Sequence, residues 1–321
     1  MLVLTGGAGF IGSCLLKKLN DEGISEIIVV DRLGEGDKWK NLVGKKFARF
    51  IHKDNFLEQL PDSGMEESLE AIIHIGACST TTERDADYMF ENNLNYSIEL
   101  ATYAAENNIR FIYASSAATY GDGSNGYSED NSEELRPLNV YGLSKHLFDR
   151  WVIDHELETT FTGLKFFNVF GPNEYHKGEM ASMIYKSYLQ IENLGKVRLF
   201  KSNNRDFKDG EQKRDFIYVK DAVEVLWKIL TLNKFTGIYN LGTGKARTWN
   251  DLVNAVYHAL GKKPTIEYVD MPDDLTGQYQ NFTQADMKKL NRSKAKFKFT
   301  SLEDGIEDYV KHYLKKDWKY F

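Results

Sequence analysis

A cluster of glycines between an apolar run and an amphipathic segment is the feature that most constrains the fold. Leu2–Thr5 is apolar and predicts a buried strand, and the segment after the glycines repeats apolar side chains at helical spacing. Gly7, Gly9 and Gly12 satisfy the pattern G-x-G-x-x-G. A tight turn, a close approach of backbone to a pyrophosphate and close packing of helix on strand each exclude a Cβ atom. The loop therefore predicts a dinucleotide site at a helix N-terminus.

Asp31 is a carboxylate at the position expected for a ribose-binding acid. The apolar run Glu26–Asp31 predicts a second strand, and Asp31 lies about 20 residues beyond the glycine loop. This context favours dinucleotide binding over a glycine turn that serves only packing. Asp31 favours NAD, because a carboxylate repels a 2′-phosphate. Arg32 argues for NADP, because a guanidinium can clasp a phosphate, and Lys38 and Lys53 could add positive charge. The residues alone leave NAD and NADP both open.

Short apolar runs alternate with helical patterns over the first half of the chain. The expected strands lie at 47–51, 71–75, 110–114 and 162–167, and the expected helices at 87–108 and 141–157. This alternation predicts an α/β fold with a doubly wound parallel sheet, covered by helices on both faces.

After residue 167 the pattern loosens, apart from a helix near 221–230 and a strand near 238–241 that look like returns to the main sheet. We therefore expect two interleaved domains. They are a dinucleotide-binding Rossmann domain over 1–167 and about 214–245, and a smaller α/β substrate-binding domain over about 168–213 and 246–321.

Composition excludes several classes of protein. The 321 residues are 42% hydrophobic and 27% charged, which is typical of a globular chain. The net charge of −6 argues against nucleic-acid binding, because such proteins concentrate Lys and Arg against phosphates. No apolar stretch approaches the ~20 residues of a membrane span, and no signal peptide is recognisable. Cys14 and Cys78 cannot build a disulfide framework, so we expect free thiols and a cytoplasmic location. No metal-ligand spacing occurs, so no metal is expected.

A tyrosine and a lysine share one face of the helix expected at 141–157. Tyr141 and Lys145 are four residues apart, and the preceding strand ends at Ser115-Ser116. Both elements should meet at the carboxyl edge of the sheet, where open α/β folds bind ligands. A free tyrosine has a pKa of ~10, but the Lys145 ammonium and an oxidised nicotinamide would favour the phenolate. Tyr141 could then accept an alcohol proton while Ser116 binds the same oxygen. The alternative is that Tyr141 only bridges core and water.

Several motifs together resemble the extended short-chain dehydrogenase/reductases, a family of nucleotide-sugar epimerases, dehydratases and reductases. They cover nearly the whole chain: Thr5–Gly12, Ser115–Gly121, Tyr141–Lys145, Phe167–Pro172, Arg214–Val219 and Asn240–Gly244. A narrower set resembles the branch that epimerises C6 of an ADP-linked heptose for the lipopolysaccharide core: Gly76–Thr82, Ser115–Tyr120, Leu138–Gly142, His176–Gly178, Met180–Ser182 and Phe282–Asp286.

The resemblance implies an isomerase that oxidises C6 to a transient ketone and reduces it again with the same bound cofactor, typically NADP. It also implies a homo-oligomer, often a pentamer. Tyr141 and Lys177 become the two acid/base groups, with Ser116 and Lys145 completing the catalytic set. The implied cofactor positions are Gly6, Gly7, Gly9, Phe10, Ile11, Gly12, Asp31, Arg32, Lys38, Lys53, Ile75, Gly76, Ala77, Cys78, Ser79, Asn92, Tyr141, Lys145, Val169 and Lys177.

The implied substrate positions are Ser116, Asn168, Glu179, Lys186, Phe200, Lys201, Ser202, Asn203, Arg214 and Tyr279. Glu179 and Lys186 depart from the family, which more often has a small Ser-like residue and a His there. Lys177 has a second interpretation as a point-charge partner of the diphosphate. Arg214 pairs either with that diphosphate or with Asp215 or Asp221 in a structural ion pair.

Two other functions remain open from the residues. One is another nucleotide-sugar epimerase, such as a 4-epimerase. A 4,6-dehydratase is less expected, because Ser116–Tyr120 contains no acid to eliminate water. The other is a non-catalytic dinucleotide sensor or scaffold that kept the fold. A sensor would need neither Ser116, Tyr141 nor Lys145, and their presence speaks against it.

Overall fold

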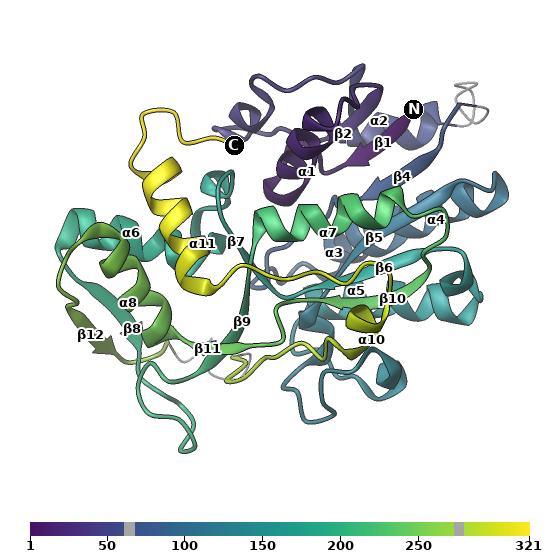
Figure 1. The fold of residues 1–321 in the computed structure, drawn as a ribbon. Coiled ribbons are helices and arrows are strands. Elements are labelled where there is room, and N and C mark those ends of the chain that lie inside the picture. The colour runs from purple at the N-terminus through teal and green to yellow at the C-terminus, as the bar shows by residue number, and fades with distance from the viewer. Residues whose placement is uncertain (61–67, 273–278) are drawn as a thin grey trace.

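The computed structural model describes residues 1–60, 68–272 and 279–321 (Figure 1). Its central feature is a seven-stranded sheet in the order β10-β6-β5-β4-β1-β2-β3. Every neighbouring pair in this sheet is parallel. The strands are β1 (Leu2–Thr5), β2 (Ile27–Asp31), β3 (Arg49–His52), β4 (Ala71–His74), β5 (Arg110–Ser116), β6 (Thr162–Phe166) and β10 (Gly237–Leu241). The predicted doubly wound parallel fold is confirmed.

Helices cover both faces of this sheet because successive strand residues point to opposite sides. Leu2 and Leu4 pack into the core under α1 (Phe10–Asp21) and α7 (Val219–Thr231), which lie along one face (Figure 1). Val3 packs into a second core, under helices on the other face. Those helices are α2 (Lys53–Gln59), α4 (Tyr96–Glu106) and α5 (Val140–Asp154). Strands buried on both faces explain the continuous apolar runs of the sequence.

Two smaller sheets and several helices complete the chain. β9 (Lys213–Tyr218) lies between β7 (Asn168–Phe170) and β11 (Ala246–Thr248), and β8 (Val197–Phe200) pairs with β12 (Ile266–Val269). The other α-helices of the described residues are α3 (Ala86–Met89), α6 (Met183–Leu194), α8 (Trp249–Leu260), α10 (Lys288–Arg292) and α11 (Leu302–Tyr309). Short 3₁₀ turns span Lys38–Leu42, Ala117–Tyr120, Glu129–Glu134, Leu157–Thr159 and Tyr175–Met180, and π-helical turns span Phe90–Asn95 and Val310–Leu314.

The structure refines three predicted elements. The helix expected at 87–108 is divided, because the π-helical turn Phe90–Asn95 separates α3 from α4. The strand expected at 47–51 begins at Arg49. Within the segment 214–245, β10 joins the seven-stranded sheet as expected, whereas β9 pairs with β7 and β11. The division into two domains stays a prediction.

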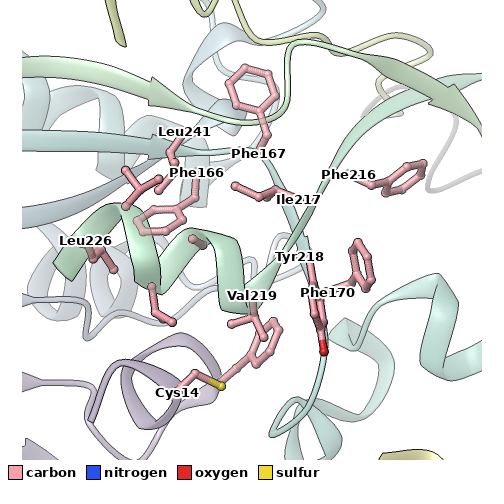
Figure 2. Close-up of a cluster of buried hydrophobic side chains, with 14 of the residues drawn as sticks. Cys14, Phe166, Phe167, Phe170, Phe216, Ile217, Tyr218, Val219, Leu226 and Leu241 are labelled. Atoms are coloured by element: carbon pink, nitrogen blue, oxygen red, sulfur yellow. The ribbon is translucent and has the colours of Figure 1, made fainter. Parts of the chain in front are cut away.

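One apolar core runs beneath the junction of the large sheet and the β7–β9 strands. Figure 2 shows Phe166 and Phe167 at the end of β6, close to Ile217 of β9 and Leu226 of α7. The Phe170 ring stacks on Tyr218 with 5.3 Å between ring centroids. The side chains at the ends of β6, β7, β9 and β10 pack into this same core, which supports the residues that follow these strands.

A buried ion pair lies below the predicted catalytic residues. The Lys165 ammonium of β6 is 2.5 Å from Asp149 Oδ2 of α5, and their side chains are 1% and 0% exposed. The same carboxylate oxygen accepts a hydrogen bond from Ser115 Oγ at 2.6 Å, and Lys165 also donates to Thr119 Oγ1 at 2.9 Å. This network ties α5 to β5 and β6.

Lys165→Met should therefore destabilise the protein strongly, because it leaves the Asp149 carboxylate buried without its counter-charge. We expect the free energy of unfolding in urea to fall by about 3–5 kcal/mol, and the double variant Lys165→Met/Asp149→Leu to recover most of it. Lys262→Met removes an exposed pair with Glu192 and should cost about 1 kcal/mol or less. Equal losses in the two single variants would contradict this assignment.

Candidate active site

A cleft of about 940 Å³ opens at the carboxyl ends of the parallel strands. One side consists of residues at the ends of β1, β2, β4, β5 and β6. The other side comes from the turn Tyr175–Met180 and from α6, β8 and the start of α8. The strand order reverses at β1 and β4, which is the position at which doubly wound sheets bind ligands.

The glycine loop lines this cleft, and two of its positions have no room for a side chain. A Cβ on Gly12 would lie 2.1 Å from the carbonyl oxygen of Gly6. A Cβ on Gly6 would lie 2.6 Å from the Gly76 nitrogen, and Gly6 has a φ of +69°. Gly9 caps α1 without any side-chain hydrogen bond. The amides of the first helical turn are therefore left for an anion.

Asp31 is already held by three donors. Its carboxylate accepts hydrogen bonds from the amides of Ala8 at 2.8 Å and Arg32 at 2.7 Å, and from Lys38 Nζ at 2.5 Å. Arg32 and Lys53 line the same end of the cleft. Lys38 balances the charge of Asp31 and Lys53 pairs with Asp54 at 2.6 Å, so Arg32 is the cation that leaves this end of the cleft positive.

The loop after β4 forms the facing side of the same half of the cleft. Ile75, Gly76, Ala77, Cys78 and Ser79 all line it, as does Asn92. Asn93, which the sequence analysis did not select, is 1% exposed and fixes this loop. Its side chain accepts from the Cys78 amide at 2.8 Å and donates to the Cys78 carbonyl at 2.9 Å. Two consecutive asparagines inside a predicted helix were the sequence feature that could have indicated this role.

Tyr141, Ser116 and Lys145 meet at the bottom of the cleft, as predicted. Asn139 caps α5 by accepting from the Gly142 amide at 2.8 Å, which places Tyr141 in the first turn. Burial raises the pKa of Tyr141, and a hydrogen bond with Ser116 partly offsets this. Burial also lowers the pKa of Lys145 to about 8, and its ammonium donates to the Ala114 carbonyl at 2.9 Å. In the protein alone, Ser116 rather than Lys145 favours the phenolate of Tyr141.

Lys177 enters the cleft from the turn Tyr175–Met180. Its ammonium lies 5.7 Å from the centre of the Phe10 ring and makes no ion pair within residues 1–60, 68–272 and 279–321. Burial lowers its pKa, and the charge of Glu174 opposes this. A lysine without a partner and with a lowered pKa is suited to proton transfer.

Aromatic side chains define the other end of the cleft. The Arg214 guanidinium lies 5.6 Å from the Trp249 ring and 5.1 Å from the Tyr279 ring, and Trp249 donates its indole N–H to the Tyr279 hydroxyl at 2.8 Å. Arg214 is 6% exposed and forms no ion pair among the described residues, so the expected alternative pair with Asp215 or Asp221 is absent there. Trp249 was not selected from the sequence, because nothing local marks it.

The structure gathers most predicted residues at this cleft. Phe10, Ile11, Ser116, Asn168, Val169, Glu179, Lys186, Phe200 and Tyr279 are further lining residues. Five predicted residues do not line it. Gly7 faces Leu4 and Val29 behind the loop, and Arg214 lies behind its two rings. Lys201, Ser202 and Asn203 also lie outside the lining, and Lys201 pairs with Asp270.

Comparisons with solved structures agree with the parallel sheet. The chain belongs to the NAD dependent epimerase/dehydratase family, whose model matches residues 2–242.

Its relatives narrow that class. The ADP-L-glycero-D-manno-heptose-6-epimerase of Nitratidesulfovibrio vulgaris (strain DP4) is 53% identical over 316 residues, or 98% of each chain. That of Fusobacterium nucleatum is 47% identical over the full length of both chains. The solved Helicobacter pylori ADP-L-glycero-D-manno-heptose-6-epimerase has a TM-score of 0.82 and 29% identity, over 97% of this chain and 95% of that one. The resemblance found in the motifs is confirmed.

A metal site and a membrane-spanning helix are both absent from the described residues. Within the described ranges, no three His, Cys, Asp or Glu side chains are grouped so that they could hold a metal ion. In the same residues, no helix is both long and apolar enough to cross a membrane. That no metal takes part in the reaction stays a prediction.

A buried histidine supports the glycine loop from below. His74 of β4 is 1% exposed and forms hydrogen bonds with Thr5 Oγ1 at 2.7 Å and Ser97 Oγ at 2.8 Å. Thr5 Oγ1 in turn accepts from the Gly76 amide at 3.1 Å. Burial lowers the pKa of His74 from 6.5 to about 3, so the ring stays neutral in the folded protein.

This histidine should make the protein less stable in mild acid. In the unfolded chain His74 takes up a proton below pH 6.5, whereas in the folded protein it does so only near pH 3. The free energy of unfolding therefore decreases as the pH is lowered through that window. From about pH 7 to about pH 5 the His74 contribution is about 2 kcal/mol. Urea unfolding of His74→Gln should show a pH dependence weaker by that amount, whereas exposed His258→Gln should match the wild type. An unchanged slope in His74→Gln would refute the assignment.

Proposed function

We propose that the protein epimerises ADP-D-glycero-D-manno-heptose at C6 to ADP-L-glycero-D-manno-heptose, a precursor of the lipopolysaccharide core. The observation that carries this proposal is that Tyr141 and Lys177 reach one cleft from different elements, beside the glycine loop. An epimerase of this kind needs two acid/base groups, because the substrate oxygen occupies a different place in each half of the reaction. The names of relatives that are 47% and 53% identical support the choice of substrate.

The residues present fit a nicotinamide dinucleotide. Gly6 and Gly12 have no room for a Cβ against neighbouring backbone, and the first-turn amides of α1 have no side-chain cap. The loop at Ile75–Ser79 and the side chains of Asp31 and Arg32 would hold the remainder of the dinucleotide. When bound, the cofactor supplies reversible hydride transfer, which lets C6 pass through a planar ketone and back. The family description names NAD as the coenzyme class.

The side chains of the chain itself would move the proton of the C6 hydroxyl. Tyr141 accepts or donates it on one side of the cleft, where Ser116 hydrogen-bonds the phenol and would orient the substrate oxygen. Lys177 does the same from the turn on the opposite side, since its lowered pKa makes the neutral amine accessible. Trp249 and Tyr279, the cleft-lining rings beside Arg214, would bind the sugar-nucleotide end.

Removing either acid/base group should stop turnover. Tyr141→Phe and Lys177→Met should each lower kcat by about 10²–10⁴-fold, because the lost group would transfer a proton in the transition state. Proton NMR of ADP-D-glycero-D-manno-heptose incubated with pure protein measures the C6 epimer directly. Tyr268→Phe and Lys262→Met, both away from the cleft, are matched controls. Wild-type rates in either cleft variant would overturn the two-group assignment, and no epimer with the wild type would overturn the function.

We infer further that the cofactor is NADP. Asp31 already forms an ion pair with Lys38. Within the described ranges, the only side-chain hydrogen-bond partner of Arg32 is Tyr88 Oη at 3.4 Å. A 2′-phosphate would give Arg32 a charge-assisted partner.

Arg32→Ala should then weaken NADP binding by about 10–100-fold, the value of one hydrogen bond to a charged group, and leave NAD binding nearly unchanged. Titration of the cofactor-free protein with each dinucleotide measures both affinities. Arg49→Ala, on neighbouring β3 and bonded to Gln59, should change neither. Equal weakening for NAD and NADP would contradict the proposal. The expected pentameric homo-oligomer and the cytoplasmic compartment stay predictions.

A further inference from the structure

A buried carboxylate closes the turn that carries Lys177. Glu174 is 1% exposed and directly precedes the turn Tyr175–Met180. Its Oε1 accepts from the Gly171 amide at 3.3 Å and from the Ser182 hydroxyl at 2.7 Å, and its Oε2 accepts from the Ser182 amide at 2.5 Å. Gly171 follows β7 and Ser182 caps α6. One side chain therefore joins the two ends of the turn.

The contacts of Glu174 suit its ionised form. The two amides that contact it can only donate, and the Ser182 hydroxyl is free to donate as well, so carboxylate oxygens that accept satisfy every partner. Glu174 forms no ion pair among the described residues. Burying a carboxylate is costly, and a neutral amide or hydroxyl could tie two loop ends at a lower cost. Burial raises the pKa of Glu174 and the hydrogen bonds from Ser182 and Gly171 oppose that rise, so a carboxylate kept at this position calls for a second role.

Lys177 is the lysine of the same turn, three residues after Glu174. Its backbone amide donates to the Glu174 carbonyl at 3.0 Å, so the ammonium and the carboxylate belong to one short turn. Glu174 is the charged group that acts on the Lys177 ammonium against the effect of burial. The other titratable groups that interact electrostatically with this pair come from its own turn, α1, α6 and α11: His176, Tyr175, Cys14, Tyr185 and Tyr309.

We propose that Glu174 is a positioning residue for Lys177: it fixes the turn from both ends and supplies the negative charge that balances the ammonium. Without that charge, burial alone would act on Lys177, and its amine would be neutral over a wider pH range. The catalytic importance of this role rests on the proposed function, whereas the coupling between the two side chains does not.

The coupling can be measured without substrate. Trace acetic anhydride labels neutral amines, so labelling of the purified protein across about pH 6–11, followed by mass spectrometry of the Lys177 peptide, gives the pKa of Lys177. In Glu174→Gln this pKa should fall by about one unit, the lower end of the effect of a nearby opposite charge. The control is Asp221→Asn, a carboxylate that is 6% exposed and likewise accepts from an amide and a hydroxyl, both of Thr300.

An unchanged Lys177 pKa in Glu174→Gln would overturn the proposal, as would an equal shift in Asp221→Asn. Ser182→Ala tests the positioning role separately, and serves also if Glu174→Gln does not fold. It keeps the charge but removes one bond to the carboxylate and the cap bond to the Tyr185 amide, so the Lys177 pKa should stay unchanged while kcat falls about tenfold and KM changes little. An unchanged kcat in Ser182→Ala, in a protein that epimerises, would refute the positioning role. A wild type that does not epimerise would refute the proposed function and leave the labelling result standing.

Discussion

The absence of a Cβ atom at Gly12 is the constraint on which the rest of the site depends. It lets α1 approach the Gly6 carbonyl closely enough that the first helical turn faces the end of β1. The same loop brings the Ala8 amide onto Asp31, so the ends of β1 and β2 are fixed together. His74 and Thr5 then join that corner to the loop after β4. One packing contact thereby sets the position of three strand ends and of the cleft above them.

Two loops around the cleft are positioned by polar side chains rather than by sheet geometry. Asn93 fixes the loop after β4, and Glu174 fixes the turn that carries Lys177. Each is almost fully buried and makes two hydrogen bonds to backbone groups, which gives loops a defined conformation without secondary structure. The side chains proposed to react with substrate therefore rest on rigid supports from two different parts of the fold.

The strongly periodic N-terminal elements could be predicted from the sequence with nearly correct bounds. The same holds for the glycine loop and the Tyr141–Lys145 pair, because spacing along one helix or around one turn is local. Asn93, Trp249 and Glu174 could not be found in this way. Their roles depend on partners in other elements, or on a π-helical turn that no simple periodicity marks. Lys201, Ser202 and Asn203 lie away from the cleft lining, since β8 ends before them and the chain turns toward Asp209.

The core shown in Figure 2 joins the two sides of the cleft. Only Phe167 separates β6 from β7, and its amide donates to the Leu241 carbonyl at 3.0 Å, so no linker joins the two sides of the cleft. Phe166, Phe167 and Ile217 belong to one buried core, so opening the two sides as rigid bodies would expose part of that core to water. A protein that is not required to close around its ligand loses no affinity to a minor binding-competent population. The shared core therefore opposes a hinged closure of the two sides around a ligand.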